Sequence, residues 1–391
     1  MKIAILTSGI MPVPAVQGGA VENLIDFYLE YNHQYQLHNI TVFSIWHPDV
    51  RNHSDKESEA NHYQYIKQNG ILAKINKYFY QKQHQNEYYH YTIEYYFEQA
   101  YKKIRKERYD LIIVENRPGF ILKLRERTKI PSILHLHNDF LCTETYKAKK
   151  IYDAYRRIIC VSDYITNRVQ SIYPTSLGKC ITIHNAIDLK RFKKIIPANR
   201  ECIGLCEKDF IIVYSGRLTE EKGILQLIQA IKQVQDIPNI KLVIIGASAY
   251  GPDKQPTSFI KKLEEESESI KDKVVFTGFI NYIQIPTYLK MADIAVVPSM
   301  WEEPFGLTVV ETMASGLPLI TTRSGGIPEI CEGVATIVER DNIVDNLATA
   351  ILDLYQHPEK REQMTTASLE RSKIFDKDAY AKNFFEAIKS I

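Results

Sequence analysis

The stretch SMWEEPFGLTVVETMASGLPLITTRSGGIPE, residues 299–329, has the pattern of a strand end, a helix and a second strand. Glu311 is the only charged residue from Gly306 to Gly316, and its neighbours are mostly Leu, Val, Met and Ala. A carboxylate in such surroundings costs several kcal/mol unless something pairs with it. The next cation, Arg323, lies beyond the second strand. We therefore expect Glu311 either to reach the surface or to meet a partner that the chain does not supply.

The composition is that of a soluble globular protein. The chain has 391 residues, of which 45% are hydrophobic and 25% charged. This length is sufficient for two domains. It has no apolar run of the roughly 18 residues that a membrane-spanning helix needs, and the apolar start is too short for a signal-peptide core. The six cysteines show neither disulfide nor zinc spacing. We expect a cytosolic protein with reduced thiols.

Both halves of the chain alternate strand-like and helix-like segments, as doubly wound parallel sheets do. The strand-like runs are short and apolar on both faces, which is typical of strands covered on each side by helices. They are 2–6, 39–44, 111–114, 132–135, 158–161 and 180–184 in the first half, and 210–214, 241–245, 274–277, 294–297, 318–321 and 335–338 in the second.

A basic, proline-containing stretch, residues 188–204, separates the two halves. The sequence therefore predicts an α/β protein with a domain at 1–195 and a second at 196–375. The last segment, 376–391, has a helical apolar pattern and is expected to pack back on the first domain.

Charge and tyrosine are unevenly distributed. Residues 1–195 carry 28 Lys and Arg against 19 Asp and Glu, a net +9, and residues 196–391 carry 21 against 28, a net −7. This asymmetry favours an anionic partner for the first half, although ordinary solvated faces would look the same. Residues 63–109 hold 11 of the 25 tyrosines. Such a segment suits a membrane interface as well as helices packed with tyrosines at their borders.

Two strand-to-helix loops could bind anions. SGIMPVPAVQGGAVENLI, residues 8–25, places Gly18 and Gly19 before a helix, where free N–H groups favour negative charge. YSGRLTEEKGI, residues 214–224, places Arg217 and Lys222 after a strand, where open α/β sheets collect ligands. Both cations could bind a diphosphate. They could equally be solvated side chains that balance the charge of the neighbouring glutamates.

Glu303 and Glu311 could be taken for the carboxylate pair of a glycosidase. Eight helical steps would separate them by about 12 Å at a rise of roughly 1.5 Å per residue. Hydrolase pairs lie about 5–9.5 Å apart, so hydrolysis is disfavoured, although a turn at Pro304 could shorten the gap. A division of roles fits better: Glu303 faces one hydroxyl-bearing group, the N–H groups at 305–308 face a phosphate, and Glu311 accepts hydrogen bonds from another sugar.

These residues resemble a known family. EPFGLTVVE, residues 303–311, is similar to the E-x7-E element of the retaining glycosyltransferases of family 4. Other segments match in family order: IICVSDYI, HNAIDLKRF, GRLTEEKGI, LVIIGA, VVFTGFI, MADIAVVPS and MASGLPLITTRSGGIPEI. The resemblance covers most of the chain and is weakest over residues 50–109. It implies the GT-B fold, in which two Rossmann-like, doubly wound parallel-sheet domains face each other across a cleft.

The resemblance also implies roles for residues of the second domain. Arg217 and Lys222 would hold the diphosphate of a sugar nucleotide, Glu311 its ribose hydroxyls, and Glu303 would act at the transferred sugar. The remaining donor-binding positions would be Gly216, Phe279 and Ile280 (beside the base), and Phe305, Gly306 and Leu307.

In the first domain the resemblance places His137 close to the sugar as a catalytic residue, with Gly18 and Gly19 closing over the phosphate and acceptor. His135 competes for this role, because alternation along a strand sends both side chains to the same face. We favour His137, which lies at the carboxyl end; a structural histidine is the other interpretation. No metal is expected, because Arg217, Lys222 and a helix N-terminus would neutralise the departing diphosphate.

The expected activity is transfer of a hexose, with retention, from a nucleotide diphosphate sugar such as a UDP-sugar to a saccharide acceptor. The acceptor would include saccharides carried on polyprenyl diphosphate, in the synthesis of a surface polysaccharide such as a capsule. The protein would be cytoplasmic, at the inner face of an anionic membrane, without a nucleic-acid partner. A nucleotide-sugar epimerase of the same fold and a non-catalytic sugar-binding protein are the alternatives.

Overall fold

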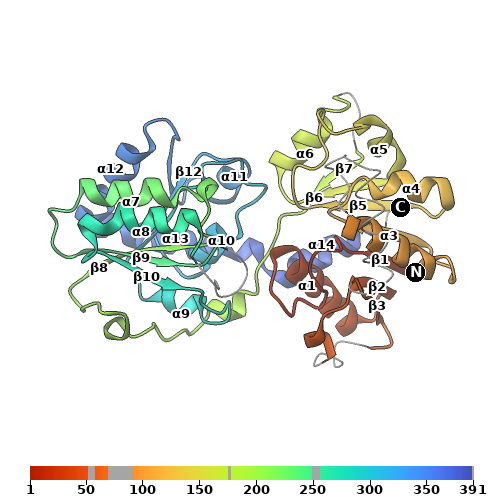
Figure 1. Ribbon diagram of the computed structural model, residues 1–391, viewed down its shortest axis with the longest axis horizontal. Coiled ribbons are helices and arrows are strands. Elements are labelled where there is room, and N and C mark those ends of the chain that lie inside the picture. Colours follow the sequence, from red (N-terminus) through yellow and green to blue (C-terminus); the bar gives the residue numbers. More distant parts are fainter. Residues whose placement is uncertain (52–57, 69–90, 175–177, 249–255, 390–391) are drawn as a thin grey trace. The chain divides into compact units, whose positions relative to one another are not determined.

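The computed structural model describes residues 1–51, 58–68, 91–174, 178–248 and 256–389. The chain forms two compact units (Figure 1). The first contains Met1–His184 together with Lys377–Ile391, and the second contains Asn185–Asp376. The predicted boundary after residue 195 lies inside the second unit. Within the described residues, no helix is both long and apolar enough to cross a membrane.

A parallel sheet forms the centre of the first unit. Among the described residues its strand order is β3-β2-β1-β4-β5-β6-β7. The apolar strands are buried on both faces because helices cover each side. The chain proceeds outward from β1 to β2 and β3, and then returns to place β4 on the other side of β1, so the topological switch point lies between β1 and β4. The strands are β1 (Lys2–Leu6), β2 (Asn39–Ile45), β3 (Asn61–Ile66), β4 (Leu111–Glu115), β5 (Ser132–Leu136), β6 (Arg157–Cys160) and β7 (Cys180–Thr182).

The last helix of the chain belongs to the first unit. Helix α14 packs against α1, and Figure 1 shows the two side by side. The rings of Tyr28 and Phe384 stack with centroids 4.2 Å apart, and Lys377 pairs with Glu30 at 3.0 Å. The helices of this unit are α1 (Ala20–Tyr35), α3 (Tyr91–Ile104), α4 (Phe120–Arg127), α5 (Ala148–Ala154), α6 (Asp163–Gln170) and α14 (Lys377–Lys389).

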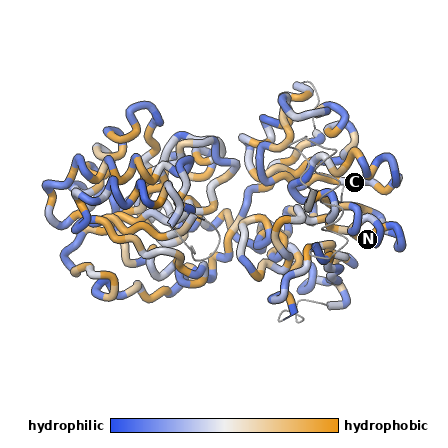
Figure 2. Tube along the Cα trace, in the orientation of Figure 1, coloured by the Kyte–Doolittle hydropathy of each residue, from blue (hydrophilic) through white to orange (hydrophobic). Residues whose placement is uncertain are grey.

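The second unit repeats this architecture with strand order β10-β9-β8-β11-β12-β13 among the described residues. Its switch point lies between β8 and β11. The strands are mainly hydrophobic (Figure 2), and their buried residues form the core with the inward faces of α7 and α12. The strands are β8 (Phe210–Ser215), β9 (Ile240–Ile245), β10 (Val274–Gly278), β11 (Ile294–Val297), β12 (Leu319–Thr322) and β13 (Thr336–Val338). The helices are α7 (Ile224–Gln233), α8 (Ser258–Ser267), α9 (Ile285–Lys290), α10 (Leu307–Ala314), α11 (Ile327–Cys331), α12 (Ile343–Gln356) and α13 (Pro358–Ser372).

The predicted α/β class with doubly wound parallel sheets is confirmed. Each of the twelve predicted strands is present, with ends displaced by at most two residues. Strand β3 was not predicted. It overlaps the start of the tyrosine-rich segment 63–109, of which residues 69–90 fall outside the described part. In the described part, Tyr96 of α3 is fully buried, and its hydroxyl donates a hydrogen bond to the backbone oxygen of Phe43, so this tyrosine belongs to the core.

Candidate functional site

The loop that follows β8 carries Arg217 and Lys222, and the loop that follows β11 carries Glu303. The two loops are joined through their backbones, because the N–H of Met300 donates to the oxygen of Glu221 at 2.8 Å. Gly223 permits this close approach, since a Cβ there would lie 1.8 Å from the carbonyl oxygen of Pro298. Both loops lie at the carboxyl edge of the sheet, at its switch point, where ligands of open α/β folds bind.

Glu303 and Lys222 form a nearly buried ion pair. The Lys222 ammonium lies 2.5 Å from Oε1 of Glu303, to which the Ser299 hydroxyl also donates at 2.8 Å. The Glu303 residue is only 8% exposed, and Lys222 also lies over the ring of Trp301. The structure therefore brings together two residues that the sequence assigned to different parts of one donor molecule.

Backbone contacts with the loop after β12 also hold Glu303 in place. Its carbonyl oxygen accepts a hydrogen bond from the N–H of Gly326 at 2.8 Å. A side chain at Gly325 would be impossible, because its Cβ would lie 2.2 Å from the same oxygen. The loops after β11 and β12 are thus locked together, and the Glu303 carboxylate has little freedom to move.

Arg217 is more open than Lys222. Its guanidinium lies 3.7 Å from Glu221, and its side chain is 40% exposed. The Tyr214 hydroxyl fixes the backbone beneath it by donating to the Arg217 carbonyl at 2.7 Å. The neighbouring Gly216 is also crowded, since a Cβ at Gly246 would lie 1.9 Å from its oxygen. The arginine therefore has a rigid base and a side chain free to turn toward a ligand.

The predicted helix N-terminus is present as α10. Gly306 precedes it with φ +117° and offers no side chain to cap the first turn. Phe305 is buried and packs edge-on against Phe375. The backbone of Leu307 begins the helix. This first turn follows Glu303 directly, so its N–H groups and positive dipole end lie on the same loop as the ion pair.

Glu311 is buried one turn deeper in α10, but the expectation that the chain supplies no partner was wrong. The Tyr282 hydroxyl, from the loop after β10, hydrogen-bonds its carboxyl group, and the charge of Arg191 acts on it. Arg191 itself stacks on the Tyr282 ring at 5.2 Å. Burial still dominates and raises the pKa of Glu311 to about 7, against the lowering effects of Tyr282 and Arg191. Phe279, 42% exposed, and the half-buried Ile280 lie just before Tyr282.

Replacing Glu311 by glutamine should stabilise the second unit at high pH. A carboxyl group whose pKa is raised on folding contributes its full stability below the unfolded pKa and loses it as pH rises through about 7. The advantage of the variant over the wild type should therefore grow by up to about 3 kcal/mol between pH 4.5 and pH 8. Urea unfolding can follow Trp301 in a Trp46→Phe background. An advantage that does not change with pH would contradict the assignment.

In the first unit, the Gly18-Gly19 loop leads into α1, with Gly19 at the N-cap and φ +102°. A Cβ on Gly19 would lie 2.3 Å from Oε2 of Glu22, so glycine leaves room for this buried carboxyl group. Burial, with added repulsion from Glu115 and Asp26, raises the pKa of Glu22 to about 7 against a backbone hydrogen bond and one from Ser8. Sequence reasoning did not single out Glu22.

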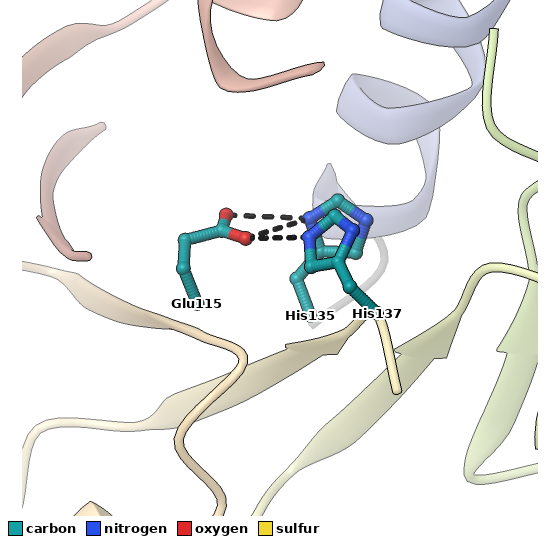
Figure 3. Close-up of side chains that lie close together, drawn as sticks. All are labelled: Glu115, His135 and His137. Atoms are coloured by element: carbon teal, nitrogen blue, oxygen red, sulfur yellow. Dashed lines mark hydrogen bonds and ion pairs between the residues drawn. The ribbon is translucent and has the colours of Figure 1, made fainter. Parts of the chain in front are cut away.

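His137 follows β5, and both it and His135 contact Glu115, the last residue of β4 (Figure 3). Oε2 of Glu115 lies 3.0 Å from Nδ1 of His135 and 3.0 Å from Nε2 of His137. All three residues are buried, and their ligand atoms lie within 4.8 Å of one another, a spacing that could hold a metal ion. Sequence reasoning missed Glu115, although it is a lone charge at the end of an apolar run, the same signal that drew attention to Glu311.

Two family models match the chain. Residues 37–191 match Glycosyltransferase Family 4, and residues 196–371 match Glycosyl transferases group 1. Spore coat protein SA of Bacillus subtilis is 30% identical over 381 residues, covering 93% of this chain and 92% of its own. The chain belongs to glycosyltransferase family 4. The two parallel sheets are accordingly those of the GT-B fold, and the protein is a glycosyltransferase.

Two further proteins are similar to this family 4 glycosyltransferase. It is 25% identical over 245 residues to an Escherichia coli protein named UDP-Gal:alpha-D-GlcNAc-diphosphoundecaprenol alpha-1,3-galactosyltransferase, covering 58% of this chain and 61% of the other. The crystal structure of Anabaena Alr3699/HepE in complex with UDP-glucose superimposes with a TM-score of 0.74 at 19% identity, over the whole of both chains. That likeness establishes the fold.

Proposed function

We propose that this glycosyltransferase moves a hexose from a nucleotide diphosphate sugar, specifically a UDP-sugar, to a saccharide hydroxyl with retention at the anomeric carbon. The observation that carries the proposal is the Lys222–Glu303 ion pair at the switch point of the second sheet, beside Arg217 and the first turn of α10. Cations and a helix N-terminus suit a diphosphate, and a held carboxylate next to them suits the sugar attached to it.

The chemistry requires one bond to break and one to form at the sugar. The anomeric carbon loses its bond to the diphosphate oxygen and gains one to the acceptor oxygen, while the acceptor proton passes to the departing diphosphate. Lys222, Arg217 and the α10 dipole would stabilise the negative charge that develops on the leaving group. Glu303 would hold the hexose, Glu311 the ribose, and Phe279 and Ile280 would border the base. This set needs no metal ion for charge neutralisation.

We further propose that the acceptor is a lipid-linked saccharide, such as one on polyprenyl diphosphate, used to build a surface polysaccharide. The net +9 charge of residues 1–195 supports this, because basic residues near an anionic membrane contribute about 1 kcal/mol each. The Escherichia coli relative is named for a diphosphoundecaprenol-linked acceptor. The protein would then work on the cytoplasmic side, as a peripheral membrane protein.

A thermal-shift panel of UDP-, GDP- and dTDP-sugars tests the donor. A ligand present at about a hundred times its Kd stabilises the folded state by about 2.7 kcal/mol, so a UDP-sugar should raise the Tm clearly. Nucleotide release should follow and should increase when membrane extract supplies the acceptor.

The Lys222→Met variant should lose most of the rise in Tm that the UDP-sugar causes. Lys241→Met, in the same unit but hydrogen-bonded to the backbone of Asp272, should keep it. Stabilisation by no sugar nucleotide in the panel, or an equal response from both variants, would refute the assignment of this loop to the donor. Nucleotide release without transfer to any acceptor would instead indicate a hydrolase, and conversion of the sugar nucleotide without net release would indicate an epimerase.

A further inference from the structure

The carboxylate of Glu115 accepts hydrogen bonds from residues of α1, of β5 and of the loop after β5. Oε1 accepts from the hydroxyl of Tyr28 on α1 at 2.8 Å, and Oε2 lies 3.0 Å from a ring nitrogen of each histidine (Figure 3). The side chain is fully buried. Burial raises its pKa, but the charge of His135 and the hydrogen bonds from both histidines outweigh this and hold the pKa at about 2. Glu115 is therefore an ionised acceptor, and an acceptor-only group requires its partners to donate.

This requirement determines which nitrogen of His137 carries the proton. The nitrogen facing Glu115 is Nε2, so Nε2 must be protonated. Burial and the charge of His135 lower the pKa of His137 to about 4, against the raising effect of Glu115, so the imidazole is neutral at pH 7. The lone pair is then on Nδ1. This atom is buried and has no hydrogen-bond partner within the described residues, which costs about 1–3 kcal/mol.

The surroundings of the His135 ring differ from those of the His137 ring. The His135 ring packs against the rings of Phe384 and Tyr380 of α14, at centroid distances of 5.2 and 6.4 Å. His135 donates from Nδ1 to Glu115 in either protonation state. His137 is instead held at its backbone, where its N–H donates to Oδ1 of Asn116 at 3.1 Å. Nε2 of His135 is likewise buried without a partner within the described residues, but its ring lies among the aromatic rings of α14, whereas His137 lies just beyond the carboxyl end of β5.

We propose that Glu115 is a positioning residue that locks His137 in the Nε2–H tautomer, so that Nδ1 accepts a hydrogen bond from a sugar hydroxyl. This proposal rests on the proposed function, which places His137 beside the sugar. A divalent metal at the same three residues is the competing use. The tautomer lock accounts better for the geometry, because three protein donors already satisfy the carboxylate at ordinary hydrogen-bond distances.

Imidazole nitrogen NMR of the whole protein tests the lock without any substrate. A His137→Ala variant assigns the signal. The wild type should show a single neutral tautomer with the proton on Nε2. Glu115→Gln, whose amide both donates and accepts, should mix or reverse the tautomers. Tyr28→Phe removes another donor to the same carboxylate and should leave the His137 tautomer unchanged. A wild-type signal with the proton on Nδ1, or an unchanged signal in Glu115→Gln, would overturn the proposal.

Kinetics with the sugar nucleotide that stabilises the protein separate this proposal from the proposed function. Glu115→Gln should lower kcat at least tenfold with little change in donor KM, as expected of a wrong tautomer. A fully active His137→Ala, or a fully active Glu115→Gln, would overturn the role of Nδ1 while leaving glycosyl transfer established. Retention of one Zn²⁺ per chain after chelation by the wild type, but not by Glu115→Gln, would assign the cluster to a metal and also overturn it.

Discussion

Replacing Glu303 by glutamine is expected to lower glycosyl transfer by at least about a hundredfold, the usual cost of removing one charged group aimed at a transition state. The carboxylate pairs with Lys222 and accepts from Ser299, and its backbone is held by Gly326. Glutamine has the same shape, so these backbone contacts should persist. Turnover with the donor identified in the thermal-shift panel measures the effect, and Tm and circular dichroism confirm folding.

The neighbouring carboxylate provides a matched control. Glu302 is half-exposed, pairs with Arg340 and accepts from the N–H of Gly325 at 2.6 Å. Glu302→Gln should therefore lose little activity, although it lies one residue away on the same loop. Near-normal transfer by Glu303→Gln, or equal losses in the two variants, would remove Glu303 from the catalytic site.

The second large effect is structural. Gly223→Ala should destabilise the second unit by about 3 kcal/mol or more. The new Cβ would lie 1.8 Å from the oxygen of Pro298, and the backbone of Gly223 has φ +72°, which is unfavourable for alanine. Overpacking costs about 1–3 kcal/mol and the left-handed conformation about 1–2. Urea unfolding followed at Trp301 in the Trp46→Phe background measures the loss.

Gly204→Ala separates the two contributions. Gly204 has nearly the same backbone conformation, φ +77°, but no atom lies within 4 Å of its would-be Cβ. This variant should lose only the conformational part, about 1–2 kcal/mol. Equal losses at the two positions would mean that the contact between the loops after β8 and β11 is not tight, and that Lys222 is positioned by other means.

The sheets were predictable because their strands carry a local signal. Runs such as Leu111–Val114 are apolar on both faces, as strands buried beneath helices on each side must be. Strand β3 lacks this signal. Its sequence, NHYQYI, contains Asn, His and Gln, and it pairs only with β2 at the edge of the sheet, where its four central residues are half-exposed. A run of apolar residues reflects burial on both faces, and the residues of an edge strand are too exposed to form such a run.

The candidate site was predictable where its residues lie in contiguous motifs, as Arg217 and Lys222 do. It was not predictable where tertiary contacts decide. Glu115 meets donors that are 20, 22 and 87 residues away, and Glu311 meets Tyr282 from a different loop. None of these distances along the chain corresponds to the repeat of a helix or a strand. The lone charge at the end of an apolar run identifies such a carboxylate, but its partners become evident only when the sheet order is known.

The position of α14 has a consequence for how the protein is made. The ring of Tyr28 stacks on Phe384, yet the whole second unit is translated between them. At roughly 5–20 residues per second, about 10–40 s pass between the synthesis of residue 184 and that of Phe384. During this time the first unit lacks α14, and Tyr28 lacks its stacking partner. A premature stop codon within α14 would therefore damage the part of the protein that was synthesised first.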